Sequence, residues 1–206
     1  MSVYLLDDDS GVQSAIGFAF RTTGLKLEAY ATPSQLLSEI SHDEPSCLIL
    51  DLQLKGTTGT KCLNDPDFAI KVDMPVIVLT GTAEVSDVVE TMKLGVIDFL
   101  EKPVEFSVLL DSVQVALKED ASRMGRIRES AQITELSKTI TEREREVVAL
   151  ICEGYSSKQI ATKLGISMNT VANHRARLRQ KTGAANTAEL IRLVVLADSV
   201  RKQAAA

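Results

Sequence analysis

The sequence predicts two domains of different class: a doubly wound α/β domain with a five-stranded parallel sheet, followed by a smaller all-α helix-turn-helix domain. Short apolar runs alternate with helical patterns through the first part of the 206 residues, and from Thr141 onward only helical patterns occur. Charge divides in the same way, because residues 1–136 hold 11 Lys and Arg against 22 Asp and Glu, whereas residues 137–206 hold 12 against 6. An acidic half suits cations and protein surfaces, and a basic half suits a polyanion.

Short apolar segments bounded by polar residues are the predicted strands, because such runs are typical of strands buried on both faces of a parallel sheet. Four such runs are Val3–Leu6, Cys47–Asp51, Pro75–Thr80 and Ile97–Leu100. A fifth strand is predicted at Leu25–Tyr30, where apolar and polar residues alternate. Helical patterns separate them, so we expect a parallel sheet with helices on both faces.

The helices of this domain are predicted from apolar residues at three-to-four spacing and from glycine or proline near their ends. They cover Gly11 to about Thr23, Pro33 to about Ser41, residues 60–71, Val85 to about Leu94, and Ser107 onward. Pro66 lies inside the third, and proline removes a backbone donor, so we expect that helix to be short or broken. Residues 53–59 contain two glycines and are expected to be a loop.

The last of these helices continues its apolar spacing beyond the point where the domain should end. The stripe consists of Val113, Leu117, Ala121, Met124, Ile127 and Ala131. Polar residues surround it, so residues 119–139 are expected to form an exposed helical linker, which either pairs with a copy of itself or is a solvated tether.

Four helices are expected in the second domain: Thr141 to about Cys152, Ser157–Leu164, Ser167 to about Lys181, and Thr187 to about Val200. Thr141 and Glu144 have the spacing of a capping box, and Gly165 provides a tight turn. Two short helices joined by a glycine turn, the second rich in arginine, are typical of a helix-turn-helix.

Polar residues follow four of the predicted strands. Asp7 and Asp8 come after the first, Asp51 ends the third, Thr80 ends the fourth, and Lys102 follows the fifth. The carboxyl ends of parallel strands meet at one edge of a sheet, so we expect these side chains to converge.

The residue types at this edge indicate three chemical roles. The carboxylates offer hard oxygens, which suit Mg²⁺. Asp51 is then a candidate nucleophile toward a phosphoryl group, and Thr80 and Lys102 are candidate partners for phosphoryl oxygens. Each residue taken alone is more often a cap, strand or loop residue, so the prediction depends on their joint placement.

Asp7-Asp8, Asp51, Thr80 and Lys102-Pro103, in this order, resemble the receiver domain of two-component response regulators, a flavodoxin-like fold; the match covers residues 1–118. The resemblance implies that Asp51 accepts a phosphate from a sensor histidine kinase. It also implies that Mg²⁺ is held by Asp7, Asp8, Asp51 and the backbone carbonyl of Gln53.

The same resemblance implies a switch that couples the hydroxyl of Thr80 to the aromatic ring of Phe99. Three positions depart from the family pattern. Lys55 stands where proline is usual, Gln13 replaces a frequent basic residue, and Pro66 interrupts the third helix. None of these removes a catalytic group, but they bear on the rigidity of the loop and the lifetime of the phosphate.

An aspartyl phosphatase on a similar fold is an alternative of another class. Such an enzyme needs a second acid two residues after the nucleophile to protonate the leaving group. Position 53 is glutamine, so the sequence disfavours an enzyme of this kind.

The third helix of the second domain is the predicted recognition helix. With Val171 at the centre of its buried face, a rotation of ~100° per residue places Leu178 and Thr182 on the same side. The candidate DNA-binding residues lie on the outer face, along its flanks or near the core edge: Asn169, Thr170, Asn173, His174, Arg175, Arg177 and Lys181. Such a helix suits the major groove, although a solvated arginine-rich face would carry the same charge.

The segment Thr141–Val147 and the later Lys158–Ala161, Thr170-Val171 and His174-Arg175 resemble the LuxR-type DNA-binding domain. Joined to a receiver, this arrangement is similar to FixJ/NarL-type transcription factors. The resemblance implies binding as a homodimer to a symmetric double-stranded DNA operator. It also implies a dimer contact on the last helix, through Leu190, Ile191, Val194 and Ala197; by periodicity alone that stripe is equally suited to a core.

The predicted organisation is therefore a receiver at 1–118, a helical linker at 119–139 and a DNA-binding domain at 140–206. The predicted function is a response regulator controlled by phosphorylation of Asp51; the alternative is a phosphorylation-independent interaction module. The three cysteines lack metal spacing, and no signal peptide or membrane-spanning run is evident. We expect a soluble cytoplasmic protein with reduced thiols.

Overall fold

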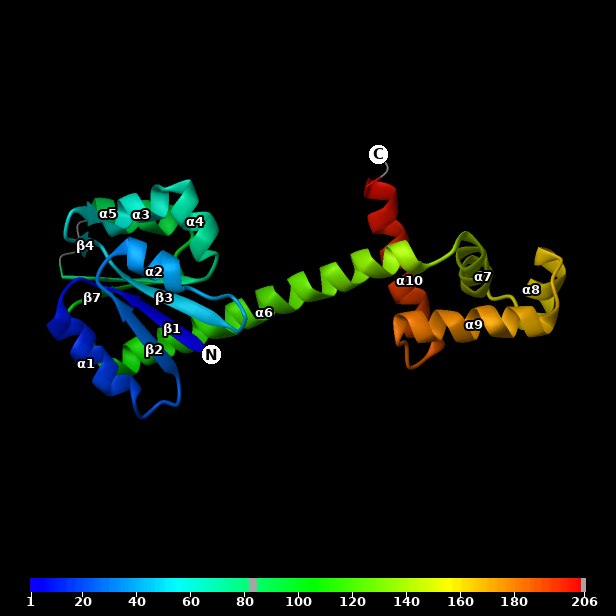
Figure 1. The fold of residues 1–206 in the computed structure, drawn as a ribbon, viewed down its shortest axis with the longest axis horizontal. Coiled ribbons are helices and arrows are strands. Elements are labelled where there is room, and N and C mark those ends of the chain that lie inside the picture. The colour runs from blue at the N-terminus through cyan, green and yellow to red at the C-terminus, as the bar shows by residue number, and fades with distance from the viewer. Residues whose placement is uncertain (82–84, 205–206) are drawn as a thin grey trace. The chain divides into compact units, whose positions relative to one another are not determined.

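The computed structural model describes residues 1–81 and 85–204, with side chains over 1–81 and 88–202. A five-stranded sheet in the order β2-β1-β3-β6-β7 forms the centre of the N-terminal unit, and all its neighbouring strands are parallel (Figure 1). The strands are β1 (Ser2–Leu6), β2 (Lys26–Tyr30), β3 (Ser46–Asp51), β6 (Val76–Thr80) and β7 (Asp98–Glu101). This confirms the predicted doubly wound fold.

The helices of this unit begin and end at local signals. They are α1 (Ser10–Phe20), α2 (Pro33–Glu39), α3 (Gly59–Asn64), α4 (Pro66–Val72), α5 (Val85–Lys93) and α6 (Phe106–Thr139). Asp9 caps α1 and Thr32 caps α2. Asp65 both ends α3 and caps α4, so the interruption predicted at Pro66 is confirmed.

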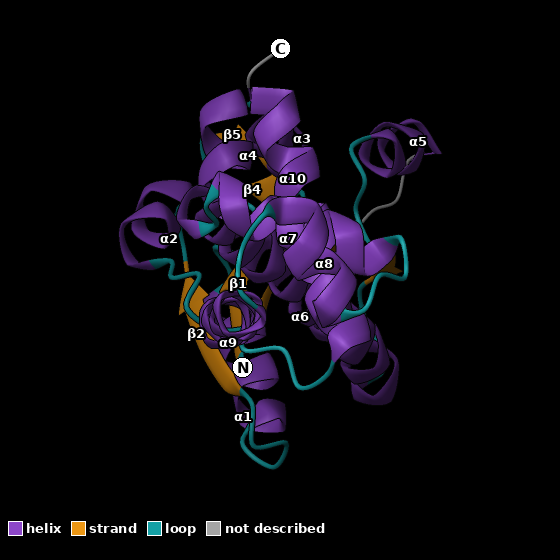
Figure 2. Ribbon diagram, turned by 90° about the vertical axis from the view of Figure 1, so that its right-hand side faces the viewer, coloured by secondary structure: helices purple, strands orange, loops and turns teal. Residues whose placement is uncertain are grey.

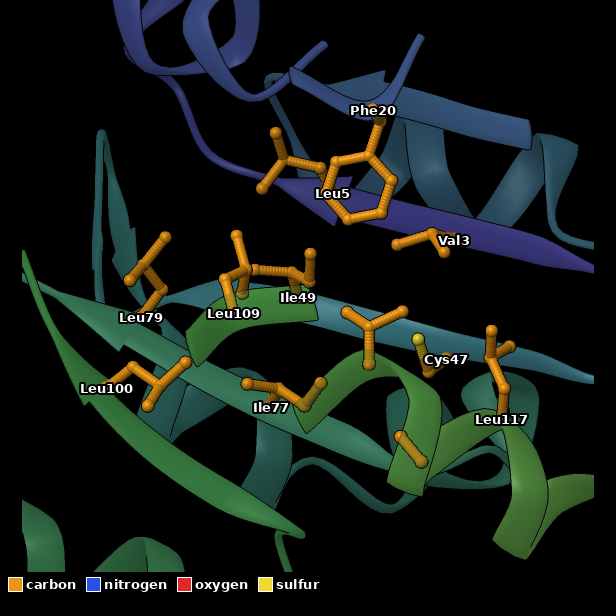
Figure 3. Packing of buried hydrophobic residues seen from close by; sticks show 12 residues of the cluster. Val3, Leu5, Phe20, Cys47, Ile49, Ile77, Leu79, Leu100, Leu109 and Leu117 are labelled. Carbon is orange, nitrogen blue, oxygen red and sulfur yellow. The ribbon is translucent and has the colours of Figure 1, made fainter. Parts of the chain in front are cut away.

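The two faces of the sheet are covered by different helices. Alternate residues of the strands point to opposite faces, so Val3 and Ile49 pack with α1 and α6, whereas Tyr4 and Leu48 pack with α2 and α4. Figure 3 shows the first face, where Phe20 of α1 and Leu109 of α6 meet side chains of the strands. With both faces buried, the strands are positioned by apolar packing, and their carboxyl ends share one edge.

Residues 53–58, expected to be a loop, instead form an antiparallel hairpin of β4 (Gln53–Leu54) and β5 (Thr57–Thr58). Lys55 and Gly56 make its turn, and the positive φ of 83° at Gly56 suits glycine. Gly59 follows where a Cβ atom would lie 2.5 Å from the carbonyl oxygen of Asp51, so only glycine allows this close approach. The hairpin is therefore held against the end of β3.

The C-terminal unit is built from helices joined by short loops (Figure 2). They are α7 (Glu142–Cys152), α8 (Ser157–Leu164), α9 (Met168–Thr182) and α10 (Thr187–Ala204). The predicted capping box of Thr141 and Glu144 is present, and Gly165 ends α8 with a left-handed conformation, φ 64°. Val171 and Leu178 are the buried residues of α9, as expected.

The α10 stripe lies in the core of its own unit. Leu190, Val194 and Ala197 are buried against Val148 of α7 and Leu178 of α9. The expectation that this stripe is a dimer contact is therefore wrong for these three side chains, and the alternative of an intradomain core holds.

Helix α6 contributes residues to the cores of two compact units, Met1–Gly125 and Arg126–Ala206. Val113 and Leu117, the first members of the predicted linker stripe, are buried in the N-terminal core. Ile127 further along the stripe is exposed, whereas Ile133 and Leu136, outside the stripe, pack against the C-terminal core. The first residues of the predicted stripe therefore pack inside the N-terminal unit.

A buried carboxylate on α6 anchors this helix to the amino-terminal edge of the sheet. Asp120 accepts a hydrogen bond of 2.9 Å from the backbone of Ser46, and its other oxygen lies 2.8 Å from Nε of Arg123. Arg123 also pairs with Asp73, which ends α4, at 2.7 Å.

No helix among the described residues is long and apolar enough to cross a membrane.

Candidate functional site

Three carboxylates meet at the carboxyl edge of the sheet. Strands β1 and β3 are parallel neighbours, so Asp7, just beyond β1, and Asp51, the last residue of β3, come side by side. One oxygen from each of Asp7, Asp8 and Asp51 lies within 4.8 Å of the others. Asp7 is fully buried and Asp51 is 6% exposed, so water screens their repulsion poorly.

Lys102 supplies positive charge to this cluster. Its ammonium lies 2.6 Å from Oδ2 of Asp7 and 2.7 Å from Oδ2 of Asp51. Burial alone would lower the pKa of Lys102, but the hydrogen bonds to Asp51 and Asp7 outweigh it and raise the pKa above its ordinary value. The ammonium is therefore a fixed cation beside Asp51.

Backbone groups orient the same carboxylates. The N–H of Asp9 donates to Oδ1 of Asp7, and the N–H of Gln53 donates to Oδ1 of Asp51, both at 2.9 Å. Asp51 thus has one oxygen on a backbone amide and the other on an ammonium.

The side-chain amide of Gln13 donates a hydrogen bond of 2.5 Å to the backbone carbonyl of Asp7. This contact was not predicted from the sequence.

An open hollow lies over the cluster. Its lining includes Asp8, Asp51, Gln53, Lys55 and Lys102. The ammonium of Lys55 lies 3.1 Å from Oδ2 of Asp8. The sequence showed Lys55 only as a departure from the family pattern and did not predict this contact. The hollow therefore has lysines from two different segments.

The two predicted switch residues lie on adjacent strands. Thr80 is fully buried and lines a neighbouring hollow, together with Gln53 and Thr58 of the hairpin. Phe99 is half-buried and pairs in register with Val78, two residues before Thr80, so both switch residues belong to the same face of the sheet.

The donor set fits a hard divalent cation. Three carboxylates with oxygens this close satisfy the preference of Mg²⁺ for oxygen ligands and for few protein ligands. Lys102 is a half-buried partner of two of them, and the cluster retains negative charge that a cation would balance.

Helix α9, the predicted recognition helix, has three of the candidate DNA-binding residues on one exposed stripe. Asn169, Asn173 and Arg177 follow at intervals of four residues, and all are exposed. Thr170 and His174 are half-buried on the flank of this stripe.

Arg175 and Lys181, two other candidate DNA-binding residues, have polar partners on neighbouring helices of their own unit. Arg175 donates to the hydroxyl of Ser157 on α8, at 3.4 Å. The ammonium of Lys181 lies 2.7 Å from buried Glu144 and 2.8 Å from the carbonyl of Thr139. Burial alone would raise the pKa of Glu144, but hydrogen bonds from Lys181 and Thr141 lower it, so the carboxylate stays charged. Lys181 thus joins α9 to α7.

Comparison with known proteins gives a consistent family. Residues 3–114 match the response regulator receiver domain, and residues 138–194 match the bacterial regulatory proteins of the luxR family. The C4-dicarboxylate transport transcriptional regulatory protein DctR of Rhodobacter capsulatus is 34% identical over 93% of this chain and 98% of its own. The transcriptional regulatory protein FixJ of Azorhizobium caulinodans is 31% identical over 96% and 93%.

Solved structures agree. The response regulator StyR superposes with a TM-score of 0.80 at 32% identity, over 94% of this chain and 97% of its own. Full-length FixJ from B. japonicum gives 0.56 at 27% identity, over 96% and 97%. The matched family consists of transcriptional regulators, not enzymes, which sets aside the phosphatase alternative. The chain belongs to the FixJ/NarL-type response regulators, in which a receiver domain precedes a LuxR-type DNA-binding domain.

Proposed function

We propose that Asp51 accepts a phosphoryl group from a sensor histidine kinase and that this modification controls promoter binding by the C-terminal unit. The observation that carries the proposal is the ammonium of Lys102 shared between Asp7 and Asp51, at 2.6 and 2.7 Å. A cation fixed there stabilises a negatively charged phosphoryl group on the neighbouring carboxylate. We also propose the domain limits 1–118, 119–139 and 140–206.

The transfer forms one bond and breaks one. A carboxylate oxygen of Asp51 keeps a second lone pair besides the one that accepts a hydrogen bond, and this lone pair attacks phosphorus. The phosphorus–nitrogen bond of the donor phosphohistidine breaks, and its electron pair stays on the imidazole. Lys102 remains beside the product acyl phosphate, and Thr80 donates its hydroxyl to a phosphoryl oxygen. The side chain of Phe99, on the adjacent strand, changes its position when Thr80 makes this hydrogen bond.

Asp7, Asp8, Asp51 and the backbone carbonyl of Gln53 would hold Mg²⁺. When bound, the ion neutralises charge on the transferring oxygens. The chain's own contribution is to hold the carboxylates ready, through the N–H groups of Asp9 and Gln53.

The second half of the proposal assigns the exposed stripe of α9 to the major groove. Asn and Arg are the side chains that read adenine and guanine edges, and Asn169, Asn173 and Arg177 stand on one line. We assign Thr170 and His174 on the flank to phosphate contacts. Arg175 and Lys181 we assign to packing with α8 and α7, because their cationic groups are engaged there.

Replacing Arg177 by Ala is expected to weaken operator binding by about 1–3 kcal/mol and to change the preferred sequence, because a bidentate base contact is lost. Asn173→Ala should weaken binding over the same range. Fluorescence anisotropy with labelled promoter fragments at several salt concentrations measures both. Arg192→Ala removes an arginine of α10 that pairs with Glu129, and serves as the charge control. Equal affinities for all four proteins would contradict the assigned face.

Beryllofluoride, which mimics a phosphoryl group on aspartate, is expected to increase self-association and operator affinity in the presence of Mg²⁺. Sedimentation velocity and the same anisotropy assay report the two effects. Asp51→Asn protein should respond to neither. An unchanged sedimentation coefficient and unchanged affinity in the wild type would favour the phosphorylation-independent interaction module instead.

A further inference from the structure

Lys55 stands on a turn whose position is fixed by the fold. It occupies the two-residue turn with Gly56, between the paired residues Leu54 and Thr57. Leu54 is buried at 7% exposure and packs into the core below the hairpin. Gly59 holds the return strand against Asp51. The side chain of Lys55 therefore starts from a defined point at the rim of the hollow that Asp8 and Asp51 line, called the acidic hollow below.

The acid cluster of Asp7, Asp8 and Asp51 forms ion pairs with two lysines that differ strongly in exposure. Lys102 is 20% exposed and contacts Asp7 and Asp51. Lys55 is 87% exposed and contacts Asp8, whose own side chain is 14% exposed. Each carboxylate of the cluster thus has an ammonium, but only one of the two ammonium groups is largely in water.

A divalent cation bound to Asp8 repels the ammonium of Lys55, which lies 3.1 Å from Oδ2 of the same carboxylate. Lys102 is held by two buried carboxylates, whereas Lys55 can turn into solvent and lose only a surface ion pair. We propose that Lys55 is a displaceable counter-ion of Asp8, which raises the concentration of Mg²⁺ that the acid cluster needs. The inference rests on the proposed function, in which Asp8 is a Mg²⁺ ligand.

The test is a calorimetric titration of MgCl₂ into the full-length, unphosphorylated protein at low ionic strength. Lys55→Ala is expected to lower the dissociation constant for Mg²⁺ by about two- to fivefold, the range of a surface ion pair. The difference should shrink at high salt, because exposed charges are screened there. Lys55→Arg should behave as the wild type. Lys71→Ala, which removes an exposed lysine of α4, changes the net charge equally and should leave the constant unchanged.

Wild-type affinity in Lys55→Ala, or equal tightening in Lys71→Ala, would overturn the inference. Asp8→Asn separates this failure from failure of the metal site. If Asp8→Asn weakens Mg²⁺ binding and Lys55→Ala changes nothing, only the role of Lys55 is wrong. If Asp8→Asn binds Mg²⁺ as the wild type does, or if the wild type takes up none, the proposed metal site falls together with the inference.

Discussion

Asp51→Asn protein is expected to acquire no acyl phosphate from a small phosphodonor such as acetyl phosphate. The amide nitrogen of asparagine is a poor nucleophile, and the amide lacks the negative charge that Lys102 now faces at 2.7 Å. The wild type should take up a label that survives acid and is released by base. Autoradiography of the denatured protein, or intact mass, measures the uptake with and without Mg²⁺.

The matched control is Asp111→Asn, an exposed aspartate on α6 outside the acidic hollow. It should be labelled as the wild type is, because the same chemical change is made far from the cluster. Full labelling of Asp51→Asn would remove Asp51 from its assigned role. Labelling that continues in the wild type after chelation of Mg²⁺ would instead remove the metal from the mechanism.

Arg145→Ala is expected to lower the unfolding free energy of the C-terminal unit by about 3 kcal/mol, from two carbonyls losing a charged donor and one ion pair being broken. Arg145 is 7% exposed, and its Nη2 lies 2.7 Å from the carbonyl of Ser137 and 3.1 Å from that of Ile140. It also forms an ion pair with Asp198 of α10. One guanidinium thus joins α7 to both the end of α6 and α10.

Hydrogen exchange measured by mass spectrometry locates this effect. Amides of α7 and α10 should lose protection in Arg145→Ala, whereas those of the N-terminal sheet should keep it. Arg192→Ala is the control, because its pair with Glu129 is half exposed on both sides and is worth about 0–1 kcal/mol. Equal protection in the Arg145 and Arg192 variants would show that the buried guanidinium contributes little.

Several predictions from the sequence succeeded because the relevant signals are local. The break at Pro66 follows from a missing donor, and the capping box of Thr141 and Glu144 follows from a spacing of three residues. The α10 stripe illustrates the opposite case. Its periodicity fits both a dimer contact and a core, and only the packing of Leu190 and Val194 against α7 and α9 decided for the core.

The hairpin after Asp51 could not be predicted for a related reason. Two glycines indicate an irregular segment, but they do not say whether its ends pair. The pairing depends on Leu54 entering the core and on Gly59 approaching the backbone of Asp51, and both are contacts with distant segments. The same hairpin carries Lys55, so the pairing of Lys55 with Asp8 could not be predicted from the sequence either.

By itself, the sequence determined which acids, hydroxyl and lysine meet at the sheet edge, because parallel strands in one sheet bring their carboxyl ends together whatever the details of packing. It also determined the helix-turn-helix, through glycine and capping residues. Only the tertiary structure decided the ionic partners: Lys55 with Asp8, Lys181 with Glu144, and Arg145 with two carbonyls and Asp198. Long cationic side chains can reach many acids, and the choice among them depends on distances of a few ångströms and on burial, which follow from the packed fold.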